Sequence, residues 1–211
     1  MRTILAFGDS NTWGLVPGSM PERRYPQDVR WTGVLQSLSP DLRIIEEGLC
    51  GRTTVFEDAF RPGRNGAAAL PFILESQSPL DGAILMLGTN DCKSVYRSSA
   101  YTIGKGIERC LDELEKFLLP PQILLVSPIH LGEHVYLPSK DPEFDRRSVE
   151  VSRELREVYQ RIAQRRGSAF VAASDFVQAS EVDDEHMDEA GHYVFAKAVL
   201  EKMGTYAVLK K

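Results

Sequence analysis

The chain has 211 residues, of which 43% are hydrophobic and 26% are charged, and its formal net charge is -5. This composition predicts one folded domain over residues 1–211 and excludes a disordered or fibrous protein. The sequence has no concentrated run of lysine and arginine, so we expect neither nucleic acid nor a membrane surface as a partner.

Cysteine usage and the length of the apolar runs favour a cytoplasmic protein. The three cysteines, Cys50, Cys92 and Cys110, match neither a disulfide framework nor a paired C-x-x-C metal site. The first apolar run is far shorter than that of a secretory signal, and no stretch approaches the roughly 20 residues that span a bilayer. We therefore expect reduced thiols in the cytoplasm.

Along the chain, short apolar or β-branched runs alternate with segments of helical periodicity. The runs predict strands over residues 3–7, 42–46, 82–87, 122–126 and 168–172. The periodic segments predict helices over residues 103–118, 151–166 and 188–203. Alternation of this kind implies right-handed crossovers and an α/β fold. We expect a three-layer α/β/α sandwich, flavodoxin-like, with a five-stranded and mostly parallel sheet.

Two connections are longer than is usual in such a fold, namely residues 52–65 and 131–143. They are candidates for lids or subunit contacts. The segment His130-Leu-Gly-Glu133-His134 overlaps the start of the second connection. It is not an H-E-x-x-H motif, and its Gly132 argues against a helix that would aim both histidines at one metal. We predict no metal site there or elsewhere. His192, on the last helix, is interpreted as a packing or surface residue.

Polar loops follow the first three strands and precede the last helix, at residues 8–14, 48–54, 88–91 and 183–186. In an open α/β sheet, chemistry lies beyond the carboxyl ends of the strands. Ser10 is a candidate nucleophile, although a serine in such a turn is commonly a helix N-cap. Asp183 stands three residues before His186, a spacing that lets it orient the imidazole. The four loops supply what acyl transfer needs.

The four blocks GDSNTWG, GLCGRTT, GTND and DDEH, in this order, resemble those of the GDSL/SGNH hydrolases over the whole chain. The resemblance implies that Ser10 is the nucleophile and that Asp183 and His186 complete the triad. It also implies an oxyanion hole formed by the backbone N–H groups of Ser10 and Gly51 and by the side-chain amide of Asn90.

More narrowly, the segments DVRWTGVL, EEGLCGRTT and MLGTNDCK are similar to the arylesterase and acyltransferase (perhydrolase) subgroup. This similarity implies a serine esterase that hydrolyses, and also transfers, short acyl groups of small esters through an acyl-enzyme, without metal or cofactor. It further implies a homo-oligomer. Trp13, so near Ser10, is a candidate wall of the substrate pocket.

Other functions fit the same residues. A carbohydrate acetylesterase, a short-chain thioesterase or a lysophospholipase would use the same site, and the pocket shape that separates them is not visible in the sequence. An alternative of another class is a noncatalytic α/β binding module that has lost activity.

Three positions depart from the usual pattern of the family. Asn11 stands where the family name has leucine, and Cys50, before the oxyanion glycine, is interpreted as a small buried residue. Asp184 and Glu185 replace the small and apolar residues that usually separate the aspartate from the histidine. If these carboxylates point inward, we expect them to raise the pKa of His186 and to move the activity optimum upward.

Overall fold

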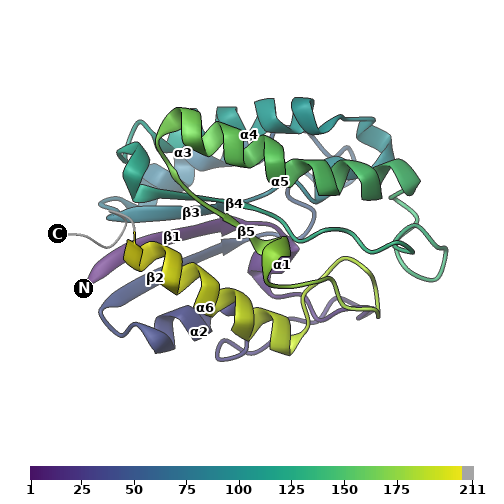
Figure 1. Cartoon of the computed structure of the whole chain (residues 1–211), viewed down its shortest axis with the longest axis horizontal. Helices are drawn as coiled ribbons and strands as arrows, with labels where there is room; N and C mark the ends of the chain where they lie inside the picture. The colour runs from purple at the N-terminus through teal and green to yellow at the C-terminus, as the bar shows by residue number, and fades with distance from the viewer. Residues whose placement is uncertain (206–211) are drawn as a thin grey trace.

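A five-stranded parallel sheet forms the centre of the computed structural model, which describes residues 1–205 (Figure 1). The strands are β1 (Arg2–Gly8), β2 (Leu42–Gly48), β3 (Gly82–Met86), β4 (Ile123–Ser127) and β5 (Ala169–Ala172). Their order across the sheet is β2-β1-β3-β4-β5, and each neighbouring pair is parallel. The predicted sheet is therefore confirmed. The chain reverses its direction of winding between β1 and β3, which is where such sheets form a crevice.

Helices cover both faces of the sheet, as the sandwich prediction requires (Figure 1). One face carries α3 (Gly66–Gln77), α4 (Ala100–Leu114) and α5 (Arg146–Arg166). The other face carries α2 (Trp31–Leu38) and α6 (Glu189–Thr205), which pack against each other. The short helix α1 (Ser10–Trp13) follows β1 directly at the carboxyl edge of the sheet.

Alternate residues of β1 pack in two separate cores, because successive side chains of a strand point to opposite faces of the sheet. Leu5 and Phe7 belong to the core beneath α3, α4 and α5. Ile4 belongs to the core beneath α2 and α6, where Trp31 and Phe195 pack edge to face with ring centroids 5.2 Å apart. Burial on both faces explains why β3 and β4 are apolar without alternation, whereas the edge strand β2 carries Arg43, Glu46 and Glu47.

The observed helices differ in detail from the predicted ones. The predicted helix over residues 103–118 ends at Leu114, after which the chain turns and still buries Leu118 in the same core. The helical spacing of apolar residues therefore extends past the end of the helix, into a turn that also buries an apolar side chain. No helix is predicted at α2 or at α3. The sequence of α3, GAAALPFILESQ, contains Pro71 and shows little contrast between apolar and polar faces.

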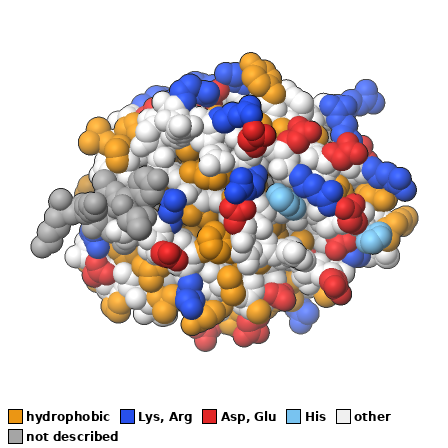
Figure 2. Space-filling view, in the orientation of Figure 1, with side chains coloured by type: hydrophobic (Ala, Val, Ile, Leu, Met, Phe, Trp, Pro, Cys, Tyr) orange, Lys and Arg blue, Asp and Glu red, His pale blue; other side chains and the backbone are white. Residues whose placement is uncertain are grey.

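Acidic and basic side chains are interspersed on the face shown in Figure 2, and hydrophobic side chains are scattered among them. Within residues 1–205, no helix has the length and apolar character needed to cross a membrane.

The glycine that ends β2 allows α1 to lie directly against the sheet. A Cβ atom at Gly48 would sit 2.1 Å from the backbone nitrogen of Trp13 and 2.6 Å from the carbonyl carbon of Thr12. Backbone atoms cannot yield as a flexible side chain can, so any larger residue would displace the turn that carries Ser10.

We therefore expect Gly48→Ala to lower the free energy of unfolding by about 2 kcal/mol or more. Chemical denaturation monitored by circular dichroism measures this loss. Gly204→Ala, in the last turn of α6 with open space around its Cβ, is the matched control and should be neutral or slightly stabilising. Equal stability of Gly48→Ala and wild type would mean that the close approach is not a constraint.

Candidate active site

The turn after β1 leaves the hydroxyl of Ser10 free for chemistry. Asp9 is the N-cap of α1, and its Oδ1 accepts a hydrogen bond of 3.0 Å from the backbone nitrogen of Asn11. Ser10 is the first residue of the helix and is 3% exposed. The alternative interpretation of Ser10 as an N-cap is therefore wrong, because Asp9 fills that role.

Ser10, His186 and Asp183 form a continuous chain of hydrogen bonds. The Oγ of Ser10 lies 2.8 Å from Nε2 of His186, and Nδ1 of His186 lies 2.8 Å from Oδ2 of Asp183. Since a carboxylate only accepts, Nδ1–H donates to Asp183, which leaves Nε2 of a neutral imidazole to accept from Ser10. The structure thus brings these three predicted residues together in the order that a nucleophile, a base and an orienting group require.

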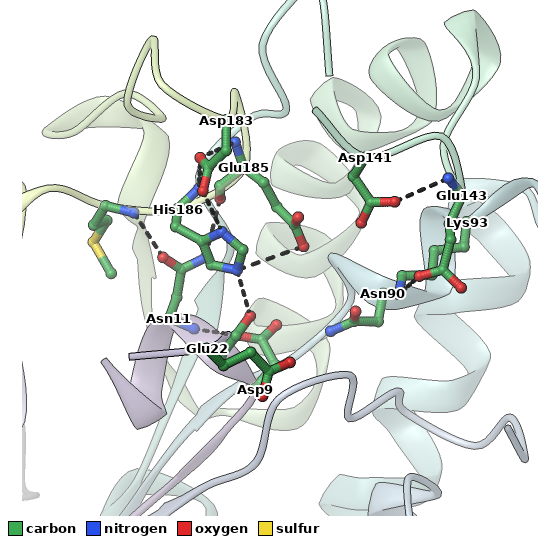
Figure 3. Close-up of polar contacts among 12 residues, drawn as sticks. Asp9, Asn11, Glu22, Asn90, Lys93, Asp141, Glu143, Asp183, Glu185 and His186 are labelled. Carbon is green, nitrogen blue, oxygen red and sulfur yellow. Dashed lines mark hydrogen bonds and ion pairs between the residues drawn. The ribbon is translucent and has the colours of Figure 1, made fainter. Parts of the chain in front are cut away.

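Asn11 ties the nucleophile turn to the histidine loop (Figure 3). Its Nδ2 donates to the carbonyl of Glu185 over 3.3 Å, and its Oδ1 accepts from the backbone nitrogen of Met187 over 2.9 Å. The two bonds flank His186 on either side in the chain. This role of Asn11 is not predicted from the sequence, where its one signal is a polar residue beside the nucleophile at a position where leucine is usual.

The second and third loops are held against the first by buried polar contacts. Asn90 donates from Nδ2 to the carbonyl of Arg52 over 3.1 Å, and the guanidinium of Arg52 donates to the carbonyl of Gly8 over 3.0 Å. Both carboxylate oxygens of Asp91 lie 3.0 Å from the backbone nitrogen of Thr54, which donates to them. Arg52 and Asp91 were not predicted as site residues, although they stand inside the predicted motifs.

Gly51 has a φ of 80°, a left-handed conformation that favours glycine. The carbonyl of Arg52, the residue after Gly51, accepts the hydrogen bond from Asn90. The loop that carries Gly51 and the loop that carries Asn90 are therefore in direct contact. An amide group has two N–H donors, and the bond to Arg52 uses one of them. In Figure 3 the amide of Asn90 points toward the side of the site that holds His186.

Glu185 points inward, and Asp184 points away. The Oε1 of Glu185 lies 3.7 Å from Nε2 of His186, whereas the carboxylate of Asp184 pairs with Lys140 at 2.7 Å. Burial lowers the pKa of His186, but the charge of Glu185 and the hydrogen bond to Asp183 outweigh burial and raise it above its ordinary 6.5. The predicted upward shift therefore applies to Glu185 alone.

Asp183 stays ionised in spite of its burial. Burial raises its pKa, but hydrogen bonds from the ring and backbone of His186 and from the backbone of Glu185 hold the pKa below its usual 3.8. The backbone nitrogen of Gly18 donates a further bond of 2.9 Å to Oδ2. Asp9, by contrast, has its pKa raised to about 6 by burial, only partly offset by its bond to Asn11.

A cavity of about 370 Å³ opens beside His186. Its walls come from residues 15–22, 139–143 and 182–186, and Trp13 is not among its lining residues. Instead, the guanidinium of Arg24 stacks on the indole at 5.3 Å from the ring centroid and donates from Nε to the carbonyl of Trp13 over 2.6 Å. The role of Trp13 as a pocket wall stays a prediction.

Cys50 and the other histidines lie outside the hydrogen-bonded chain of Ser10, His186 and Asp183. Burial raises the pKa of the Cys50 thiol to about 12, so the thiol is not ionised near neutral pH. His130 and His134 lie in an irregular segment, and no three potential ligands within residues 1–205 group as a metal site would require. His192 is buried and its Nδ1 accepts from the backbone nitrogen of Trp31 over 3.3 Å.

The arrangement predicts that Glu185 sets the titration of His186. Removing the carboxylate in Glu185→Gln should lower the pKa of His186 by about one unit, since an opposite charge within a few ångströms stabilises the imidazolium. NMR titration of the imidazole, assigned with a His186→Ala sample, measures the midpoint. Glu181→Gln, which removes an exposed carboxylate of the same loop, is the control. An unchanged midpoint in Glu185→Gln would show that Glu185 does not act on His186.

Known proteins share the family and the fold of this chain. The sequence profile of the GDSL-like lipase/acylhydrolase family matches residues 6–194. A carbohydrate acetylesterase from Sinorhizobium meliloti is 33% identical with a TM-score of 0.88, and the match covers 97% of this chain and 99% of that one.

Two further solved structures share the fold and about a third of the sequence. The aryl esterase of M. smegmatis is 34% identical with a TM-score of 0.85, and the match covers 97% of this chain and 99% of that one. A putative arylesterase from Agrobacterium tumefaciens is 34% identical with a TM-score of 0.84, with the same coverage of 97% and 99%. A search of curated protein sequences finds no match. From its profile match and its structural relatives, this chain belongs to the GDSL-like lipase/acylhydrolase family.

Proposed function

We propose that this protein is a serine esterase that hydrolyses short acyl esters through an acyl-enzyme, without metal or cofactor. The observation that carries the proposal is the chain of two 2.8 Å contacts from Ser10 through His186 to Asp183. A nucleophile, a base and an orienting carboxylate in hydrogen-bond reach of one another are the requirement for nucleophilic acyl transfer.

In the first step, Ser10 attacks the acyl carbon and His186 takes the hydroxyl proton on Nε2. The resulting imidazolium is stabilised by Asp183, which stays ionised. As the tetrahedral intermediate collapses, His186 returns the proton to the leaving oxygen, and the alcohol departs. Water, or a second alcohol, then takes the acyl group from Ser10 by the same steps in reverse.

The negative charge on the tetrahedral oxygen needs hydrogen-bond donors. We assign this role to the backbone N–H groups of Ser10 and Gly51 and to the amide of Asn90. The bond from Asn90 to Arg52 supports the assignment, because it fixes the amide plane before substrate arrives. A donor that is already oriented does not have to reorganise during the reaction.

The relatives favour two classes of ester. One is a carbohydrate acetylesterase and another is an aryl esterase, so acetylated sugars and aryl acetates are the first substrates to test. A panel of p-nitrophenyl esters of increasing acyl length, beside acetylated xylo-oligosaccharides, compares the two. Benzyl alcohol added to the same assay detects acyl transfer, which we propose as an accompanying activity.

Ser10→Ala should abolish hydrolysis of p-nitrophenyl acetate without unfolding the protein. The change removes the attacking oxygen and leaves the bond from Asn11 to Asp9, which shapes the turn, in place. Steady-state kinetics and a thermal melt measure the two properties on one preparation. Retention of more than a few per cent of wild-type kcat by the folded variant would rule out Ser10 as the nucleophile.

Asn90→Ala should lower kcat by about 100-fold to 1,000-fold with little change in KM, because the lost bond forms chiefly to the developing oxyanion. Asn90→Asp keeps the shape and removes both donors, so it should be at least as impaired. A large rise in KM with unchanged kcat would instead make Asn90 a binder of the ground state.

A further inference from the structure

The cavity beside His186 lies on the side of the site that receives the leaving alcohol. His186 gives its proton to the leaving oxygen from Nε2, so the alcohol departs next to this nitrogen. Asp183, Glu185 and His186 all line the cavity of about 370 Å³. The oxyanion donors Gly51 and Asn90, in contrast, come from the loops after β2 and β3. The residues that line the cavity therefore contact the alcohol half of the ester.

The cavity holds two carboxylates, Glu185 and Asp141, that pair with no lysine or arginine of residues 1–205. Glu185 is 6% exposed, and no hydrogen-bond donor within residues 1–205 reaches its carboxylate, whose nearest partner is His186 at 3.7 Å. Asp141 also lines the cavity, and its Oδ1 accepts only from the backbone nitrogen of Glu143 over 2.9 Å. Figure 3 shows the carboxyl groups of Glu185 and Asp141 on the same side of His186.

The basic groups near the cavity are already paired. Lys140 pairs with Asp184 at 2.7 Å, and Lys93 pairs with the carboxylate of Glu143. Farther out, Arg61 pairs with Glu22 at 3.4 Å. Since each of these cations has its own carboxylate, Glu185 is left with the imidazole of His186 as its ion-pair partner, and no described lysine or arginine pairs with Asp141. A buried carboxylate without a donor is costly, and a ligand cation would offset that cost.

Apolar side chains complete the walls. Leu15, Met20, Pro142 and Val182 line the cavity together with the carboxylates. This combination suits a group that carries positive charge on an alkylated nitrogen, because such a group is weakly hydrated and has apolar surface to bury. A sugar would instead need several hydrogen-bond donors and acceptors, and a phosphate would be repelled.

We propose that the cavity binds the cationic alcohol of its ester substrates, an amino alcohol or a quaternary ammonium alcohol. Glu185 and Asp141 are the residues that determine this specificity. The inference rests on the proposed esterase function and names its substrate class. In the overall reaction, ester and water give the carboxylic acid and the cationic alcohol, and Glu185 contacts the cation without exchanging a proton.

The test compares two esters of the same shape. Acetylcholine carries a trimethylammonium group, and its uncharged isostere carries a tert-butyl group in the same place. At alkaline pH, where Glu185 is ionised, the wild type should hydrolyse acetylcholine with a kcat/KM about tenfold higher than that of the isostere. Acetate release, corrected for spontaneous hydrolysis, gives both values. Choline should also inhibit p-nitrophenyl acetate hydrolysis more strongly than the uncharged alcohol does.

For each variant, the measured quantity is the ratio of kcat/KM for acetylcholine to kcat/KM for the isostere. A change in the pKa of His186 affects both values equally and cancels in the ratio. Glu185→Gln should bring the ratio close to one, and Asp141→Asn should lower it by a smaller factor. Glu181→Gln, which removes an exposed carboxylate that does not line this cavity, should keep the wild-type ratio. If Glu185→Gln does not fold, Asp141→Asn and the wild-type ratio still decide the question.

Two outcomes would overturn the inference. One is equal hydrolysis of the two esters by the wild type, and the other is a preference for acetylcholine that survives both Glu185→Gln and Asp141→Asn. Neither outcome affects the proposed esterase function, which fails if the p-nitrophenyl esters, the acetylated xylo-oligosaccharides and both of these esters are all left intact.

Discussion

The site depends on the two hydrogen bonds by which Asn11 holds the histidine loop against the nucleophile turn. The sheet brings Ser10 to its carboxyl edge, but His186 lies 176 residues later, in a loop before α6. The amide of Asn11 bonds the residue before His186 and the residue after it. One side chain thus sets the distance between Ser10 and His186, and the bonds of Asp183 then fix the orientation of the ring.

Several buried carboxylates surround this contact, and hydrogen bonds decide which of them carry charge. Asp183 receives bonds on both oxygens and keeps a low pKa, whereas burial raises the pKa of Asp9 and of Glu185, which has no such bonds. The resulting negative field favours the imidazolium that forms when Ser10 attacks. Because only the neutral imidazole accepts the proton of Ser10, the same field moves activity toward higher pH.

The sequence predicted the elements that follow from local pattern. The five strands were found because each contains a short apolar or β-branched run, which is fully buried in β3 and β4. The loops were found because the carboxyl ends of parallel strands meet at one edge. Other features depend on tertiary contacts. Contacts with residues distant in the chain determine three of them: the inward direction of Glu185, the two hydrogen bonds of Asn11 to the histidine loop, and the end of α4. The homo-oligomer, the cytoplasmic location and the pocket role of Trp13 stay predictions.

The central claim is that the acyl group is transferred to Ser10. Acid quenching during turnover of p-nitrophenyl acetate, followed by mass spectrometry of the intact chain and of its peptides, measures this transfer directly. The account predicts one acetyl group, located on the peptide that contains Ser10, and none in His186→Ala under the same conditions. An acetyl group on another nucleophile such as Cys50, or turnover with no acetylated chain at all, would contradict it.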